Sequence, residues 1–269
     1  MDFMKKNKSK IFFYNEIADL TNRIKKSNVI DNPFPHIIIE DGISNDITFD
    51  RLKLELVDPQ FVQDTIGRTE YRPEISPDDD IYLNLEKTII NKFNLNPPVA
   101  DVDNNLHIIK STSFSLWEDT HELDIQEIHL DYLVRNPEGF TQIETNYENQ
   151  TVFSIHIYLP DDDLHTHLGT SIYSVSSEFD NEDDKNNFYV KPDYPIISNT
   201  LITGNSYLVD KYCNTEFTIP FKKGIVYIHP TSPNSWHSAP KIPKGYTRKS
   251  LMFRVCWTYF TKDTNTIGK

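Results

Sequence analysis

The sequence predicts a mainly β protein with helices near its N-terminus, and three observations support this fold class. From about residue 106 onward, eight short runs rich in β-branched and aromatic residues follow one another, separated by turn residues. The first third instead carries apolar residues at helical spacing. The chain has 269 residues, a length that fits one large domain. We therefore expect a single domain over 1–269, in which residues 1–105 form a helical and strand support and residues 106–260 form a β sandwich or barrel.

Three helices and one strand are expected in the N-terminal support. Apolar spacing predicts a helix over residues 11–26. Two prolines just before Ile37–Ile39 exclude a helix at that point and favour a buried strand. A second helix is expected after a cap at Ser44 or Asn45, and a third begins near Asp78–Asp80, where acidic side chains favour a helix N-terminus.

The β region is predicted as a succession of strands without intervening helices. Its runs are LHIIKSTSFSLW, QEIHLDYLV, TVFSIHIYL, TSIYSVSS, SYLVDK, EFTIPF, GIVYIHP and KSLMFRVCWTYF. In the third run, alternation places Ser154, His156 and Tyr158 on one face and apolar residues on the other. The polar, acidic segment 177–187 is expected to be an exposed loop.

Charge and composition exclude several classes of function. Lys and Arg number 27 against 40 Asp and Glu, a net charge of −13, so a general binder of nucleic acid or of anionic membranes is not expected. A membrane-spanning helix needs about 20 apolar residues in a row, and no segment approaches that length. We expect a cytoplasmic protein. Cys213 and Cys256 are expected to be reduced core thiols, although one disulfide remains possible.

The run QEIHLDYLV carries a pair of potential metal ligands. His129 and Asp131 are two residues apart, so on a strand their side chains share one face. An imidazole and a carboxylate on one strand make two of the three ligands of a 2-His-1-carboxylate site. The pair alone has little weight, because chance would give about 1.3 such His-x-acid pairs in this composition. The third ligand must come from elsewhere in the chain.

A second pattern lies in WHSAPKIPKGYTRKS. His237 is followed after ten residues by Arg248, and Ser250 lies two residues further on. On a strand Arg248 and Ser250 share a face, and together they offer a guanidinium fork and a hydroxyl to a carboxylate. Chance would give about 0.016 such His-x10-Arg-x-Ser patterns in a chain of this composition.

His-x-Asp, a distal His and Arg-x-Ser together resemble the iron(II)/2-oxoglutarate-dependent dioxygenases. NPFPHIIIEDGISND followed by a helix is similar to the opening of hydroxylase branches of that superfamily, and HLGTSIYSV resembles a stretch of some bacterial and phage members. The resemblance covers most of residues 32–258. The gap between Asp131 and His237 is longer than in compact members, and we place the insertion in residues 171–216.

The resemblance implies a double-stranded β-helix core, the jelly-roll or cupin-like fold. His129, Asp131 and His237 would bind Fe(II), Arg248 would pair with the distal carboxylate of 2-oxoglutarate, and Ser250 would assist. The implied reaction uses O2, releases succinate and CO2, and hydroxylates a small-molecule or amino-acid/peptidyl substrate. Desaturation or cyclisation, the substrate itself and the oligomeric state stay open.

Several residues compete for these roles or support them. Arg254 shares the face of Arg248 and is the rival carboxylate clamp. His165 and His167 could form a cupin-like metal site of an isomerase, although Pro160 and three following Asp favour a solvated loop. A non-catalytic jelly-roll binding protein is the other alternative.

Other aromatic residues are assigned structural roles. Trp236 and Tyr132 are expected to pack behind the metal ligands and fix their rotamers. His36, His107 and His229 lie in apolar contexts and are expected to be structural.

Overall fold

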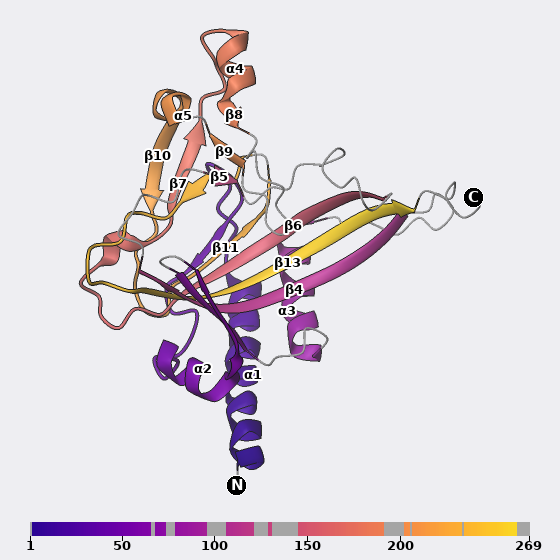
Figure 1. The fold of residues 1–269 in the computed structure, drawn as a ribbon, viewed down its shortest axis with the longest axis vertical. Helices are drawn as coiled ribbons and strands as arrows, with labels where there is room; N and C mark the ends of the chain where they lie inside the picture. Colours follow the sequence, from indigo (N-terminus) through magenta and orange to yellow (C-terminus); the bar gives the residue numbers. More distant parts are fainter. Residues whose placement is uncertain are drawn as a thin grey trace.

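The chain folds into two antiparallel β-sheets with helices packed on one side of the larger sheet (Figure 1). The computed structural model describes residues 2–65, 68–73, 79–95, 106–120, 129–130, 145–190, 202–204, 206–232 and 234–262. The fold is therefore mainly β with N-terminal helices, as the sequence predicts.

The larger sheet has seven strands in the order β1-β11-β6-β13-β4-β3-β2. Its strands are β1 (Ile37–Ile39), β2 (Val57–Thr65), β3 (Arg68–Pro73), β4 (Leu106–Asp119), β6 (Thr145–Tyr158), β11 (Val226–Pro230) and β13 (Arg248–Lys262). The three long strands β4, β13 and β6 lie side by side along its centre (Figure 1).

The smaller sheet has six strands in the order β10-β7-β12-β5-β9-β8. Its strands are β5 (His129–Leu130), β7 (Ser171–Val175), β8 (Tyr189–Val190), β9 (Ile202–Gly204), β10 (Cys213–Thr218) and β12 (His237–Ser238). A 3-10 turn, η1 (Thr166–Leu168), leads into β7.

Five helices complete the described part of the chain: α1 (Asp2–Lys26), α2 (Phe49–Leu56), α3 (Asp80–Lys92), α4 (Glu182–Phe188) and α5 (Ser206–Tyr212). The first three confirm the helices expected in the N-terminal support. The cap of α2 differs from the expectation: Thr48, not Ser44 or Asn45, caps the helix, and its hydroxyl accepts a bond from the Arg51 amide. That bond satisfies one of the amides that a helix start leaves without an intrahelical partner.

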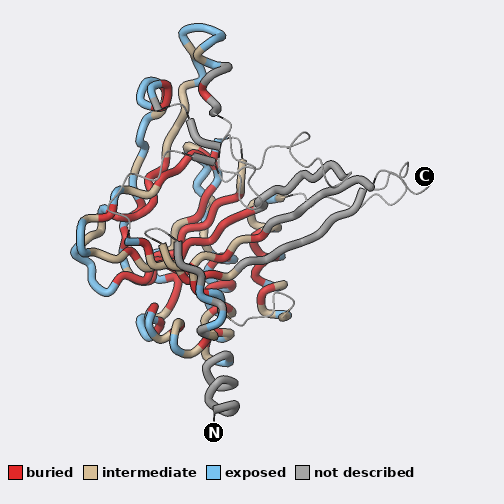
Figure 2. The backbone as a smooth tube through the Cα atoms, in the orientation of Figure 1, coloured by how far each residue is buried: buried red, intermediate tan, exposed pale blue. Residues whose placement is uncertain are grey.

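Side-chain alternation on the strands explains why the helices cover one face of the larger sheet. On β6, Phe153, Ile155 and Ile157 belong to the same buried cluster as Ile17 and Leu20 of α1. The red segments of Figure 2 trace this core along the strands and the helix faces that touch them. Burial of such side chains stabilises the fold by about 1.5–3 kcal/mol each.

The opposite face of the larger sheet meets the smaller sheet. Tyr158 and Tyr227 of the larger sheet pack in one cluster with Ile172 of β7 and with Leu168 and Phe221 from the adjoining segments. The two sheets therefore face each other across a shared interior, the arrangement of a jelly-roll, and the predicted division of β6 into an apolar and a polar face is confirmed.

Two expectations for the second half are wrong. SYLVDK is not a strand but lies in α5, where Leu208, Val209 and Tyr212 are buried at i, i+1 and i+4, a helical spacing. The acidic segment 177–187 is not wholly a loop, because most of it forms α4. Acidic residues in the first turn of α4 favour a helix over a loop.

The N-terminal support supplies more of the sheet than one strand. In addition to β1, it contributes the hairpin β2–β3, which pairs with β4 through the register Arg68↔Asp119. The hairpin has a register irregularity between Val57 and Val62, and the sequence signals for it are weak because Pro59 interrupts its first strand.

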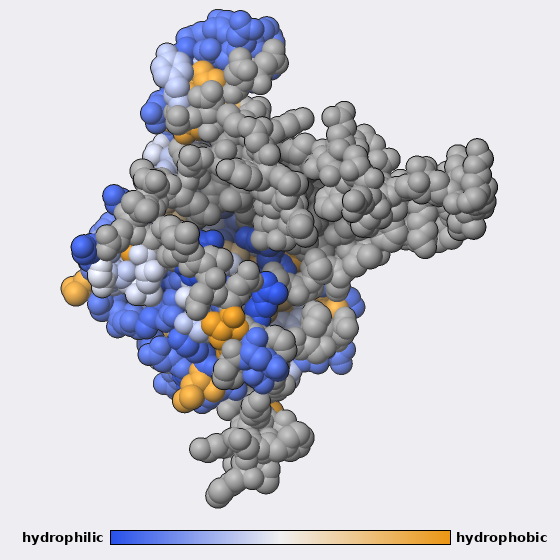
Figure 3. All heavy atoms as spheres, viewed as in Figure 1, coloured by the Kyte–Doolittle hydropathy of each residue, from blue (hydrophilic) through white to orange (hydrophobic). Residues whose placement is uncertain are grey.

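The described surface is mostly hydrophilic on the face that Figure 3 presents, with scattered apolar side chains. Among the described residues, no helix is long and apolar enough to cross a bilayer. Cys213 is a free thiol, as expected, while the side chain of Cys256 lies outside the described part.

Candidate metal and carboxylate site

His237 begins β12 in the middle of the smaller sheet and is 5% exposed. Its backbone pairs with Ile172 of β7 on one side and with His129 of β5 on the other. The ring atom Nδ1 lies 2.9 Å from the Ser235 carbonyl oxygen. Because a carbonyl only accepts, Nδ1 carries the proton and Nε2 carries the lone pair that a metal would use.

The register brings two of the three predicted metal ligands to neighbouring positions. His129 and His237, distant in sequence, are direct partners in the antiparallel pair β5–β12. Directly opposed residues of such a pair project from the same face of a sheet, with Cβ atoms about 4.5–5.5 Å apart. The side chain of His129 and all of Asp131 lie outside the described residues, as does Tyr132.

His237 faces the interior between the sheets. Its ring centroid is 4.9 Å from that of His229 on β11 and 6.5 Å from that of His156 on β6. His156 and His229 stack on each other at 5.7 Å, and Tyr227 stacks on His229 at 5.0 Å. The polar face predicted for His156 thus lines the same interior as the candidate ligand, and both His156 and His229 are buried.

Arg248 is buried at the first position of β13, 6% exposed. Its Nε donates to the Leu168 carbonyl at 2.9 Å, and its guanidinium carbon lies 5.3 Å from the Phe221 ring and 5.6 Å from the Tyr158 ring. The aromatic rings stabilise the guanidinium through cation–π contacts, and the low dielectric around it strengthens its attraction for an anion.

Arg248 also contacts the carboxylate of Asp119, which no sequence pattern indicated. Its Nη1 lies 3.4 Å from Asp119 Oδ2, and the two residues are direct partners in the β13–β4 register. Asp119 is bound more closely by Arg68 of β3, whose Nε is 2.5 Å from Oδ1. No spacing in the sequence links residues 68, 119 and 248; only the pairing of three strands brings them together.

Ser250 lies next to Arg248 on the same face, as predicted, and is 3% exposed. Its register partners are Trp117 of β4 and Tyr158 of β6. Within the described part of the chain, the buried indole Nε1 of Trp117 has no hydrogen-bond partner. Arg254, the rival clamp, is further along β13, and its Nη2 contacts the Met252 sulfur at 3.2 Å.

Tyr158 is held rigidly beside Arg248. Its hydroxyl donates to Thr170 Oγ1 at 2.7 Å and accepts from the Thr170 amide at 2.9 Å, and both residues are buried. Two hydrogen bonds and the packing of the two sheets therefore hold the Tyr158 ring in place beside the guanidinium.

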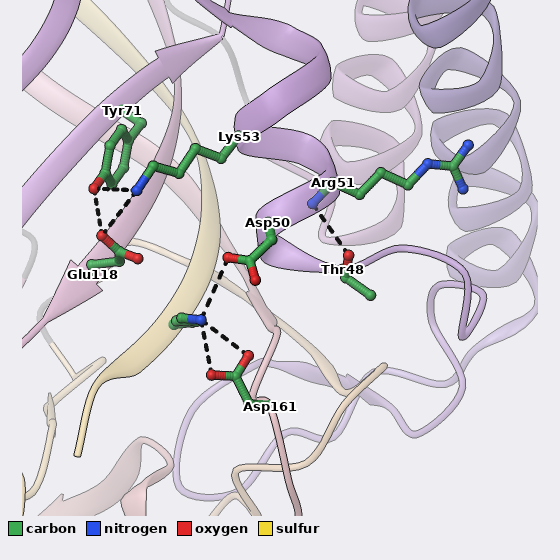
Figure 4. Close-up of polar contacts among 8 residues, drawn as sticks. Thr48, Asp50, Arg51, Lys53, Tyr71, Glu118 and Asp161 are labelled. Carbon is green, nitrogen blue, oxygen red and sulfur yellow. Dashed lines mark hydrogen bonds and ion pairs between the residues drawn. The ribbon is translucent and has the colours of Figure 1, made fainter. Parts of the chain in front are cut away.

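The strand end that carries Arg248 is anchored from its other face. Lys249 Nζ contacts Asp161 at 2.8 Å and Asp50 of α2 at 3.5 Å, and Glu118 joins Lys53 and Tyr71 nearby (Figure 4). Burial by itself would lower the pKa of Lys249, but its hydrogen bond to Asp161 and the surrounding carboxylates raise it. Lys249 stays charged and ties β13 to α2.

The competing histidine pair lies in a turn. His165 and His167 are 5.8 Å apart between ring centroids, at and within η1, and His165 packs on Tyr246 at 4.2 Å. His167 is exposed. Among the described residues, no group of three or more His, Cys, Asp or Glu side chains has a metal-binding arrangement.

Trp236 connects the candidate ligand to the region expected as an insertion. It is 1% exposed and belongs to a satellite cluster formed by Phe188, Leu208, Val209, Tyr212 and Trp236. Its ring lies 5.2 Å from that of Phe188 at the end of α4. Trp236 is packed, as expected, against the helices α4 and α5, whose segments were expected to be a loop and a strand. That it fixes the rotamer of a metal ligand stays a prediction.

Comparison with known proteins gives distant structural likenesses only. No family model matches the chain, and no curated protein matches it. HygX from Streptomyces hygroscopicus, solved with nickel, 2-oxoglutarate and hygromycin B, is 15% identical over 82% of each chain with a TM-score of 0.41. The epimerase SnoN, solved with Fe3+, alpha ketoglutarate and nogalamycin RO, is 10% identical over 94% of this chain and 91% of its own, also at 0.41.

A prolyl-4-hydroxylase from Pseudomonas putida is 11% identical over 92% of this chain and 99% of its own, with a TM-score of 0.34. At identities and TM-scores this low, these likenesses assign no activity to the chain.

Proposed function

We propose that the chain is an iron(II)- and 2-oxoglutarate-dependent oxygenase. His129, Asp131 and His237 would hold Fe(II), and Arg248 with Ser250 would bind 2-oxoglutarate. The observation that carries the proposal is the β5–β12 register, in which residues 129 and 237 are direct partners. The pairing of the strands thus supports the motif by making positions 129 and 237 neighbours.

The donor set fits a ferrous ion. Two imidazoles and one carboxylate with open positions are the ligands of non-haem Fe(II) oxygenases. The bond between His237 and the Ser235 carbonyl fixes the ring orientation and tautomer, which supports a metal ligand. His237 is buried and its described neighbours are aromatic, so its own ring is shielded from bulk water.

The surroundings of Arg248 fit one end of a diacid. The guanidinium is buried between Phe221 and Tyr158, and Ser250 adds a hydroxyl on the same face of β13. Charge-assisted hydrogen bonds to a carboxylate are strengthened in such a low-dielectric setting. Arg254 is a weaker candidate because its Nη2 is turned to the Met252 sulfur.

When bound, Fe(II) and 2-oxoglutarate supply the oxidation of a substrate C–H bond by O2, with release of succinate and CO2. The residues of the chain bind and orient: His237 and its partners hold the metal, Arg248 and Ser250 hold the far carboxylate, and the cluster around Tyr158 closes that end of the interior. Hydroxylation of a small-molecule or amino-acid/peptidyl substrate is the outcome we propose.

Two alternatives predict different results. A cupin-like isomerase built on His165 and His167 would depend on those side chains, although His165 is half-buried against Tyr246 and His167 is exposed. A non-catalytic jelly-roll binding protein would hold no iron and leave 2-oxoglutarate intact.

The test is an anaerobic titration of 2-oxoglutarate into Fe(II)-loaded protein, followed by succinate assay in air. We expect the weak visible charge-transfer band of the bound 2-oxo acid and slow succinate release. His129→Ala and His237→Ala should abolish iron binding, and Arg248→Ala should raise the 2-oxoglutarate requirement.

His165→Ala is the matched control, because it removes an imidazole just before η1, outside the proposed metal site. It should leave the charge-transfer band and the rate of succinate release unchanged. Absence of the band, or its loss in His165→Ala with retention in His237→Ala, would refute the proposal.

A further inference from the structure

Three charged residues lie in one row across three neighbouring strands. Asp119 of β4 is the direct register partner of Arg248 on β13 and of Arg68 on β3. Its Oδ1 is 2.5 Å from Arg68 Nε, whereas its Oδ2 is 3.4 Å from Arg248 Nη1. The carboxylate is therefore shared, and its shorter contact is to Arg68.

The row has one positive charge more than it has negative charges. The side chains of Asp119 and Arg248 are 8% and 7% exposed, so the charges interact with little screening by water. Arg68 and Arg248 both contact Asp119, so this carboxylate neutralises the Arg248 guanidinium less than it would if Arg248 were its one partner.

Arg68 can hold the Asp119 carboxylate on the β3 side of β4, away from Arg248 on β13. Its side chain is 38% exposed and comes from the strand on the far side of β4 from Arg248. Its guanidinium carbon also lies 4.7 Å from the Trp117 ring, a cation–π contact that restricts where Arg68 can move. The Nε bond from Arg248 to the Leu168 carbonyl holds the second guanidinium independently of Asp119.

We propose that Arg68 is a positioning residue for 2-oxoglutarate binding, which draws Asp119 away from Arg248 and so keeps the Arg248 guanidinium available to a ligand carboxylate. This rests on the proposed function, in which Arg248 receives the distal carboxylate. Without Arg68, Asp119 is an internal carboxylate that competes with the ligand for Arg248.

The experiment is a calorimetric titration of 2-oxoglutarate into Mn(II)-loaded protein, with Mn(II) affinity and thermal unfolding measured for every variant. Arg68→Gln should weaken 2-oxoglutarate binding about tenfold, the effect expected for a charged hydrogen bond redirected to a competitor. Asp119→Asn should bind at least as tightly as the unmodified chain. The double variant Arg68→Gln/Asp119→Asn should recover the affinity to within about threefold.

Arg72→Gln is the matched control, because Arg72 lies on the same strand, is 61% exposed and pairs with Glu70 rather than Asp119. It removes the same charge from β3 and should leave the affinity unchanged. A loss of affinity in this control equal to that in Arg68→Gln would overturn the inference, since net charge alone would then explain the effect.

The remaining outcomes are equally decisive. Full affinity in Arg68→Gln overturns the proposal. A loss that Asp119→Asn fails to rescue also overturns it, because Arg68 would then touch the ligand or serve only folding. If the unmodified chain binds Mn(II) but no 2-oxoglutarate, the proposed function fails first, and this inference with it.

Discussion

Removing the Phe188 ring tests whether the cluster formed by α4, α5 and Trp236 supports the candidate metal ligand. Phe188 is fully buried at the end of α4, with ring contacts to Trp236 at 5.2 Å, Phe179 at 5.4 Å and Tyr212 at 6.5 Å. Trp236 directly precedes His237, and its carbonyl accepts a bond from the Tyr173 amide on β7 at 3.1 Å. A cavity beside Trp236 is therefore one residue away from the ligand.

The expected magnitude follows from the size of the deletion. Phe→Ala in a packed core costs about 3–5 kcal/mol. Among the described residues, five buried side chains form the satellite cluster. The loss is therefore comparable with its local stability, and Trp236 should repack or become mobile. Loss of support behind a metal ligand typically lowers metal affinity by about 10–100-fold. We expect Phe188→Ala to fall in that range for Mn(II) or Fe(II).

The assay is a competitive metal titration combined with hydrogen exchange across α4, α5 and β12. Phe13→Ala is the matched control, since Phe13 is 2% exposed in the large helix-facing core and packs on Phe114 at 5.2 Å. Phe13→Ala should lower global stability and leave metal affinity unchanged. Faster exchange around Phe188 with unaltered metal affinity would refute the idea that this cluster holds the ligand in place.

Three further predictions concern stability and reactivity. Tyr158→Phe should lower the free energy of unfolding by about 2 kcal/mol, because the buried Thr170 amide loses its acceptor; an unchanged denaturation midpoint would contradict the bond. Burial lowers the pKa of His36 below its usual 6.5, so the unfolded chain binds the proton more strongly than the folded chain does. The free energy of unfolding should therefore fall as the pH drops below about 6.5, by up to about 1.4 kcal/mol per pH unit. His36→Phe should flatten that part of the stability–pH curve, and an equal slope would rule out this assignment. Burial raises the pKa of the Cys213 thiol to about 11, so its alkylation at pH 8 should be about 100-fold slower than that of a thiol with pKa 9, measured by mass spectrometry of its peptide; labelling at the free-thiol rate would disprove it.

Local periodicity was sufficient for much of the fold. The stripe of α3 and the alternation of β6 are read directly from the sequence, because each depends on residues close together in the chain. The same reasoning failed for SYLVDKY, where a short apolar run fits a strand or a helix equally well. Packing of Leu208 and Tyr212 against Trp236 decides in favour of the helix.

Some residues of the candidate site could likewise be found from sequence patterns, and others could not. Spacing drew attention to His129 with Asp131 and to His237 with Arg248 and Ser250, and the resemblance to iron(II)/2-oxoglutarate-dependent dioxygenases implied their roles. The meeting of Asp119 with its two arginine partners could not be found in this way, because it depends on the pairing of β3, β4 and β13. Strand register is set by the whole sheet, and no short pattern in the sequence reports it.

A crystal structure of the chain, grown anaerobically with Mn(II) and 2-oxoglutarate, would show the proposed metal and carboxylate site itself. We expect one ion bound by the imidazoles of His129 and His237 and the carboxylate of Asp131, with the diacid chelating that ion and its far carboxylate bound by Arg248. An ion bound by other residues, or a diacid that makes no contact with Arg248, would disprove the proposed function.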